Sequence, residues 1–179
     1  MFKKILIVLV GLVVALLIVV ALQPSQFSIT RTATVDVAPE VVFPHVNDLQ
    51  RWEAWSPWAK LDPAVKNTFE GPKEGTGAVF RWAGNDQVGE GAMTITESRA
   101  PELVRLRLDF VKPMAGTSDV EFGFAKAGAG TTVTWTMSGK NDFIGKAFCL
   151  FMNMDRMVGG QFEQGLASLK RVAEAPARP

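Results

Sequence analysis

Regular alternation of apolar and polar side chains is the feature that most constrains this chain. In Leu103–Phe110, apolar residues at even positions oppose arginine and aspartate at odd positions. In Thr131–Ser138, three threonines alternate with Val133, Trp135 and Met137. Successive side chains of a strand point to opposite faces, so this pattern predicts strands with one wet and one dry face. The alternating stretches are Ala78–Trp82, Ala92–Glu97, Leu103–Phe110, Ser118–Lys126 and Thr131–Ser138.

Two further stretches extend the predicted sheet. Phe27–Val37 is rich in threonine and valine and reads as a first strand, and a weaker run at Val65–Glu70 adds another. Glycine, proline and asparagine separate the runs, which favours tight turns between neighbouring strands. We therefore expect a curved antiparallel sheet of about six to seven strands.

Helices are predicted after the first strand and at the C-terminal end of the chain. Pro39 opens a first short helix, and a second covers Leu49–Trp55. The last stretch, Asn141–Glu174, reads as one long helix and is the only segment long enough to cover the dry face of the sheet. The predicted fold class is therefore α+β, with the sheet wrapped on a long C-terminal helix.

The N-terminal segment predicts a membrane span. Residues 5–22 carry no charged or strongly polar side chain and would extend about 27 Å as a helix, close to the thickness of a bilayer core. Lys3 and Lys4 precede this segment, so residues 1–4 are expected in the cytoplasm and the rest of the chain on the outer side. Residues 23–26 form a linker. A cleaved signal peptide is the alternative, although the apolar run exceeds the usual length.

Several local sequences, together with the order of the predicted elements, resemble those of a known family. The stretches are Ala38–Phe43, Val46–Leu49, Arg51–Trp58, Trp82–Asn85, Val88–Gly91, Gly130–Trp135 and Phe162–Lys170. They are similar to the START and polyketide-cyclase-like helix-grip superfamily, in the bacterial polyketide cyclase/dehydrase-like branch. The resemblance covers about residues 27–172 and implies a cavity between sheet and helix. It implies little about function, because the superfamily includes cyclases, lipid carriers, hormone receptors and co-chaperone-like members.

The helix-grip domain is predicted over residues 27–174. The Ala/Pro/Arg-rich end of the chain predicts a disordered tail at 175–179.

The dry face supplies the candidate binding site. Aromatic and methionine side chains can line an adaptable apolar pocket, although any one of them can instead be core. The predicted ligand-binding residues are Phe80, Trp82, Met93, Leu106, Leu108, Phe122, Phe124, Trp135, Met137, Phe148, Phe151 and Met152.

Composition argues against several other classes of site. The net charge is only +1 and no basic run follows residue 27, so no nucleic-acid partner is expected. One cysteine, Cys149, and one histidine, His45, cannot form a Cys/His zinc site, and no catalytic residue, metal or cofactor is predicted. Trp52, Trp55 and Trp58 are spaced by three, which fits a packing anchor, or else a rim at the cavity mouth or membrane surface.

The sequence thus predicts a membrane-anchored module that binds a hydrophobic small molecule or lipid. Two alternatives stay open. One is an enzyme of cyclase or dehydratase type on the same scaffold, which needs a convergent polar group with a shifted pKa in the cavity. The other is a protein-interaction domain with a filled core and an exposed apolar patch.

Overall fold

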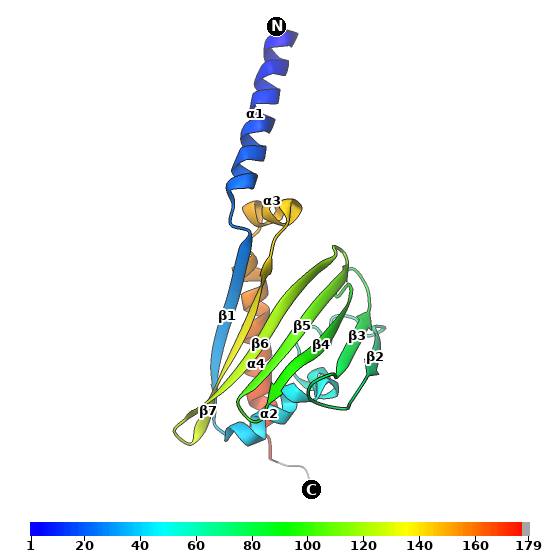
Figure 1. Ribbon diagram of the computed structural model, residues 1–179, viewed down its shortest axis with the longest axis vertical. Helices are drawn as coiled ribbons and strands as arrows, with labels where there is room; N and C mark the ends of the chain where they lie inside the picture. Colours follow the sequence, from blue (N-terminus) through cyan, green and yellow to red (C-terminus); the bar gives the residue numbers. More distant parts are fainter. Residues whose placement is uncertain (177–179) are drawn as a thin grey trace.

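Seven antiparallel strands form a single curved sheet in the computed structural model, which describes residues 1–176 (Figure 1). Their order across the sheet is β1-β7-β6-β5-β4-β3-β2, so the first and last strands of the chain are neighbours. The predicted antiparallel sheet is therefore confirmed. The strands are β1 (Gln26–Val35), β2 (Lys66–Glu70), β3 (Val79–Ala83), β4 (Glu90–Arg99), β5 (Leu103–Lys112), β6 (Gly116–Ala127) and β7 (Gly130–Lys140).

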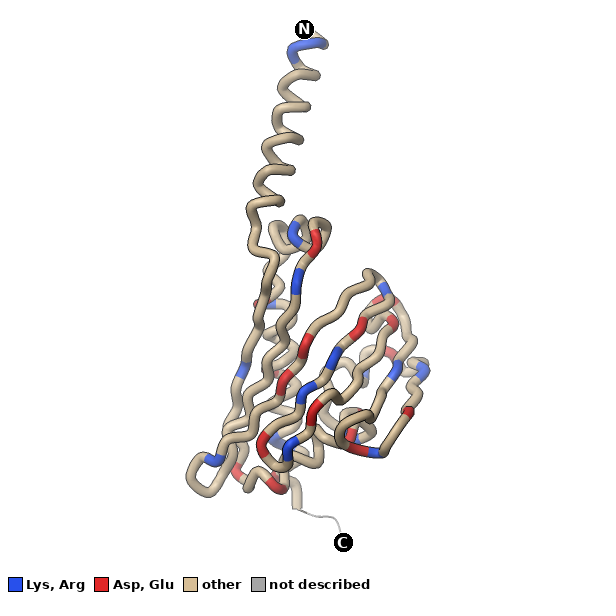
Figure 2. The backbone as a smooth tube through the Cα atoms, viewed as in Figure 1, with Lys and Arg blue, Asp and Glu red and all other residues tan. Residues whose placement is uncertain are grey.

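The two faces of the sheet differ as the alternation predicts. On the convex face, Arg105 of β5 forms ion pairs with Glu97 of β4 and Glu121 of β6, at 2.7 and 2.8 Å. Figure 2 shows such charges in alternation along β4, β5 and β6. On the concave face, Ile95 and Val133 are fully buried. Burial of the apolar side chains on one face holds the register of the sheet, because a slip of one residue would turn them outward.

Two short helices connect β1 to β2 and cover part of the concave face. The helix α2 (Pro39–Asn47) begins with proline, and the 3-10 helix η1 (Leu49–Ala54) follows directly. The carboxylate of Asp48 accepts a hydrogen bond from the backbone N–H of Gln50 at 3.0 Å and so caps η1. Both predicted helices are confirmed, the second as a 3-10 helix that ends one residue early.

The C-terminal region is not one helix, and the prediction of a continuous helix over Asn141–Glu174 was wrong. It forms α3 (Phe143–Phe151) and α4 (Met154–Glu174), with an extended residue, Met152, between them. The side chain of Asn153 accepts a hydrogen bond from the N–H of Arg156 at 2.9 Å and starts α4 anew. The long helix that the fold requires is α4 alone.

Helix α4 lies along β1 and under β7. Phe162 stacks on Trp135 of β7, with ring centroids 4.0 Å apart and an interplanar angle of 8°. Arg31 of β1 pairs with Asp155 and Glu163 of α4 at 3.0 and 2.7 Å. The hydrogen bond from Arg31 holds the pKa of Asp155 below its usual value. Helix α4 is therefore fixed by ring stacking on one strand and by ion pairs on another.

Two glycines of α4 provide a matched test of this packing. A Cβ at Gly165 would lie 2.8 Å from Cζ3 of Trp135 and 3.1 Å from Cδ of Pro57, whereas a Cβ at Gly160 would contact nothing. Both changes to alanine gain about 1 kcal/mol of helix propensity. Only Gly165→Ala overpacks the core, so it should be less stable than Gly160→Ala by about 1–3 kcal/mol. Urea unfolding of both variants in one detergent measures the difference, and equal stabilities would contradict the close contact.

Helix α1 (Phe2–Leu22) projects away from the domain and joins β1 through a short linker. Its mean hydropathy over 18 residues is 3.6, and 6% of that window is buried, unlike a core helix of a soluble domain. It is long and apolar enough to cross a membrane, by length and composition. At the other end of the chain, α4 stops at Glu174. Of the predicted tail 175–179, residues 177–179 lie outside the described part.

Candidate functional site

Six aromatic rings fill the concave face beneath α4. Trp52 and Trp55 lie 4.7 Å apart, and each packs edge-on against Phe122 and Trp135. Their indole N–H groups donate to the backbone oxygens of Val46 and His45, both at 2.9 Å. These two tryptophans therefore serve as the packing anchor that their spacing suggested. The six rings are Trp52, Trp55, Trp58, Phe122, Trp135 and Phe162.

Trp135, in the middle of this cluster, is 2% exposed. Its indole N–H is the single fully buried side-chain polar atom without a hydrogen-bond partner within residues 1–176. Leaving such a group unpaired costs about 1–3 kcal/mol. The cluster tolerates that cost because the large ring fills the space between Phe122 and Phe162.

A second row of aromatic rings lies on β2, β3 and β5 and is only partly covered. Phe69 stacks on Phe80 with centroids 5.1 Å apart, Phe80 lies 5.8 Å from Trp82, and Trp82 meets Phe110 edge-on at 6.1 Å. Phe69 is 43% exposed and the other three are partly buried. We call Phe69, Phe80, Trp82 and Phe110 the open aromatic row.

The position of the helices explains why this row stays open. Helix α4 packs mainly on β1, while α2 contacts β6 and β7 and η1 contacts β3. Within residues 1–176 no helix packs extensively on the concave side of β4 or β5. Strand pairing places Trp82, Gly91, Phe110 and Gly116 side by side, at the end of the sheet where α1 joins β1. We call this the α1 end; the open aromatic row runs toward it.

Trp82 is held in place by its neighbours. Its indole N–H donates to the backbone oxygen of Val88 at 3.0 Å. The ring lies over Gly91 of β4, where a Cβ would come within 2.6 Å of ring carbons. Because its one polar group is already bonded, the Trp82 ring offers a molecule on the concave face only apolar surface.

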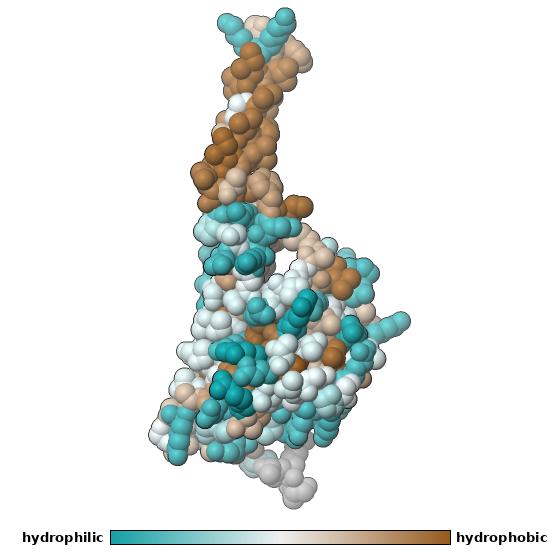
Figure 3. Space-filling model, viewed as in Figure 1, coloured by the Kyte–Doolittle hydropathy of each residue, from teal (hydrophilic) through white to brown (hydrophobic). Residues whose placement is uncertain are grey.

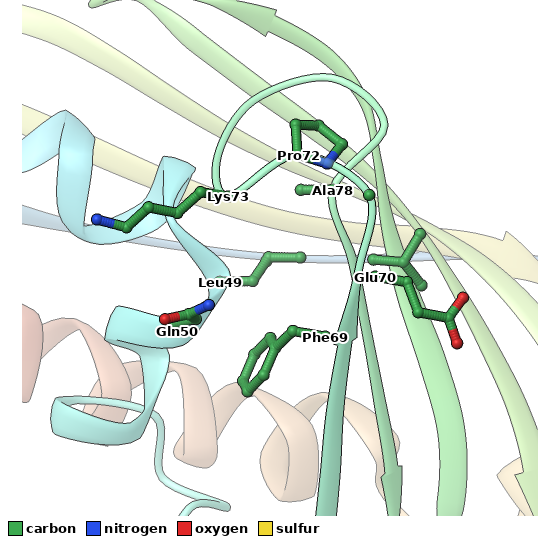
Figure 4. Close-up of a pocket in the computed structure, with 9 residues that line it drawn as sticks. Leu49, Gln50, Phe69, Glu70, Pro72, Lys73 and Ala78 are labelled. Atoms are coloured by element: carbon green, nitrogen blue, oxygen red, sulfur yellow. The ribbon is translucent and has the colours of Figure 1, made fainter.

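A small pocket adjoins the row between η1 and the β2–β3 hairpin (Figure 4). Its volume is about 220 Å³. Leu49, Phe69 and Ala78 provide apolar lining, and Gln50 and Lys73 are among its polar lining residues. That volume is smaller than the roughly 300–1,000 Å³ of most small-molecule sites. The pocket could hold one end of a ligand that continues along the open aromatic row.

A larger groove of about 520 Å³ lies at the end of the sheet away from α1, at the turn between β4 and β5. Pro39 and Glu40 of α2, Pro101, Phe124 and Lys126 are among its lining residues. None of its lining residues belongs to the open aromatic row, so the groove is a separate site.

The buried carboxylate of Asp62, between η1 and β2, already has structural partners. The carboxylate of Asp62 accepts hydrogen bonds from the N–H groups of Ala64 and Asn85, at 2.9 and 2.7 Å, and ties two loops together. Burial lowers the pKa of His45, with a smaller effect from the nearby Arg51. Asp109, whose pKa is lowered chiefly by the hydroxyl of Thr117, lies on the convex face. The arrangement offers an apolar surface with no acid–base pair on it among the described residues.

The described residues contain no group of three or more His, Cys, Asp or Glu side chains placed to hold a metal ion. Lone Cys149 lies on α3, where its sulfur accepts a hydrogen bond from the side-chain N–H of Asn141 at 3.4 Å.

The structure separates the twelve predicted binding residues into three groups. Leu106, Leu108, Phe122, Phe124 and Trp135 are buried in the packed core. Phe80, Trp82, Met93 and Met137 are partly exposed beside it. Phe148, Phe151 and Met152 do not face the sheet at all: they lie in or just after α3 and are exposed, because the chain breaks before α4.

Phe69 and Phe110 join the open aromatic row without having been predicted as binding residues. Phe110 belonged to the dry face of an alternating stretch, which was a usable signal. Phe69 lay in the weakest of the predicted strands, and its stacking on Phe80 follows from the pairing of β2 with β3. That register is not visible in the sequence.

Residues 26–174 match the family described as polyketide cyclase/dehydrase and lipid transport. No curated protein matches the chain in sequence.

Solved structures show the same fold at low identity. A protein from Chromobacterium violaceum is 16% identical with a TM-score of 0.57, over 86% of this chain and 100% of that one. The Aha1 dimer from Colwellia psychrerythraea is 15% identical with a TM-score of 0.60, over 85% and 99%. The di-domain ARO/CYC BexL, from the BE-7585A biosynthetic pathway, is 16% identical with a TM-score of 0.60, over 89% of this chain and 53% of BexL.

Proposed function

The chain belongs to the polyketide cyclase/dehydrase and lipid transport family, and from this premise we propose that it is a membrane-anchored module that binds a hydrophobic small molecule or lipid. Family membership confirms the resemblance to the helix-grip superfamily. The proposal adds a ligand class, a site and an anchor.

The observation that carries the proposal is the open aromatic row. Phe69, Phe80, Trp82 and Phe110 form a continuous apolar surface that α2, η1 and α4 leave partly exposed. Aromatic side chains gain most from losing water, since each can bury about 150–250 Å². A flat or extended apolar ligand on this row would cover it without leaving a polar group unpaired, because the indole N–H of Trp82 already has a partner.

The anchor is supported by α1. Its 21 residues would extend about 31 Å, which matches the roughly 30 Å hydrocarbon core of a bilayer. Lys3 and Lys4 at its start favour a cytoplasmic N-terminus and an outer location for the domain. A tether at this point would keep the open aromatic row near a source of hydrophobic ligands.

Replacing Trp82 with alanine should weaken ligand binding while the domain stays folded. If the ligand covers about 80 Å² of the ring, the loss is about 2 kcal/mol, or about thirtyfold in Kd. Native mass spectrometry of the full chain, released from membranes in detergent, would detect the bound molecule, and lipid extraction would identify its class. The Trp82→Ala protein should carry much less of it than the wild type.

Val41→Ala is the control, because Val41 is an apolar residue on α2 that is 47% exposed and lies outside the open aromatic row. It should retain the bound molecule. An adduct that Trp82→Ala and Val41→Ala reduce equally would argue against the open aromatic row as the site. A wild-type protein that carries no hydrophobic molecule would contradict the proposed function.

A further inference from the structure

Helix α3 presents its apolar side to solvent and its other side to the protein. At 100° per residue, its apolar side chains occupy an arc of about 160°, and Gly145, Lys146 and Cys149 occupy the rest. Ile144 is 64% exposed and Phe151 is 74% exposed, and no residue of α3 is buried. A helix on the surface of a water-soluble protein normally has the reverse orientation, with its apolar stripe toward the core.

The other face of α3, which carries Gly145, Lys146 and Cys149, is turned toward α1 and the sheet. Hydrogen bonds at the start of α3 hold the helix there. The ammonium group of Lys146 donates to the backbone oxygen of Ala21, in the last turn of α1, at 3.2 Å. The carboxylate of Asp142 caps α3 by accepting from the N–H of Gly145 at 2.7 Å. Just before it, the N–H of Asn141 donates to the backbone oxygen of Ser25 at 2.7 Å. These bonds place α3 beside the point where α1 ends, and Figure 1 shows it crosswise to α1.

We propose that α3 is an interfacial helix, which inserts its apolar side chains into the outer leaflet of the bilayer that α1 spans. This inference rests on the proposed span of α1. A 21-residue helix has almost no length to spare across a bilayer, so its last turn lies at the boundary of the hydrocarbon core. A helix bonded to that turn and lying across it occupies the depth at which amphipathic helices bind lipid.

A second apolar element lies at the same end of the molecule. The β5–β6 hairpin closes at the α1 end, and Val111 and Met114 near its tip are 54% and 51% exposed. With α3, which follows β7, it provides two apolar points at this end of the sheet. Figure 3 shows hydrophobic (brown) surface along α1 and at the end of the domain that α1 joins. Lipid contact at both points directs the open aromatic row toward the bilayer, so a ligand can pass from the leaflet to the row with little exposure to water.

Spin labels in the full-length chain, reconstituted in phosphatidylcholine vesicles, test the proposal. Cys149→Ser removes the native thiol, and single cysteines introduced by Ile144→Cys and Phe151→Cys carry a nitroxide at exposed positions. Leu12→Cys in α1 reports the bilayer interior. Ala167→Cys is the aqueous control, on an exposed side chain of α4 about 20 Å further along that helix from its start. Accessibility to oxygen, which concentrates in lipid, and to a water-soluble nickel chelate is measured at each position.

We expect the ratio of oxygen to nickel accessibility at positions 144 and 151 to be several-fold higher than at 167 and to approach that at 12. A high ratio at 12 with values at 144 and 151 like that at 167 would overturn the interfacial helix and leave the anchor intact. Shielding of 144 and 151 from both reagents would overturn it in favour of a protein partner. A ratio at 12 equal to that at 167 would remove the proposed span and this inference with it.

Discussion

Replacing Trp135 with alanine should lower the free energy of unfolding by about 3–5 kcal/mol. The ring is 2% exposed and packs against five other aromatic side chains as well as the backbone of α4 at Gly165. Its loss would open a cavity where β7, η1 and α4 meet, and rigid strands on one side cannot collapse into it. Equilibrium urea unfolding in one detergent, followed by circular dichroism, gives the difference.

Trp135→Phe is the matched control. It keeps a stacked ring against Phe162 and removes the unpaired buried N–H, so part of the lost packing is offset. It should therefore be much less damaging than alanine. An alanine variant as stable as the wild type would show that the aromatic cluster is not the core of this domain.

Three arginines in α1, at Leu9→Arg, Val13→Arg and Leu17→Arg, should abolish membrane integration. Residues 5–22 contain fifteen Ile, Leu and Val side chains, which together favour insertion by about 4.5–9 kcal/mol at about 0.3–0.6 kcal/mol each. Each arginine near the centre costs about 2.5–3.5 kcal/mol and also removes an apolar residue, so the three change the balance by about 8–12 kcal/mol. One arginine would not suffice. Extraction of membranes with alkaline carbonate measures the integrated fraction.

Phe2→Arg is the control for added charge, since it lies beside Lys3 and Lys4 at the start of α1 and should leave integration unchanged. The intact mass of the wild-type protein separates an anchor from a signal peptide. An anchor retains α1 and the full 19.5 kDa, apart from processing at Met1. A membrane fraction that holds the triple variant as firmly as the wild type, or a mature protein that lacks α1, would contradict the anchor.

The division of the concave face into a filled and an open part has a local cause. Helix α4 and η1 both contribute rings beside Trp135, whereas in the described part of the chain no helix packs extensively on β4 or β5. The side chains of the open aromatic row would be core in a narrower sheet. Here they are left partly exposed. Curvature and width of the sheet decide this, because α4 covers only the strands it lies along.

Much of the architecture could be predicted from local pattern. The alternation in Leu103–Phe110 and Thr131–Ser138 assigned each side chain to a face, and the fully buried Val104 and Val133 lie on the predicted one. The helix break was also accessible in principle, since Asn153 followed by Asp155 is a helix-start signal. It was missed because the apolar residues on both sides extend the helical pattern through it.

What the sequence by itself determined is the face of each strand, the apolar character of residues 5–22 and the order of elements that gives a sheet closed by a C-terminal helix. Tertiary structure alone decided which dry-face residues are core and which form the open aromatic row. It also turned Phe148 and Phe151 outward beside α1. The physical reason is that periodicity depends on the backbone of one segment, whereas burial depends on which distant segment packs there. Trp52 packs against Phe122 across seventy positions of the chain, whereas among residues 1–176 no helix packs extensively on β5, the strand that carries Phe110.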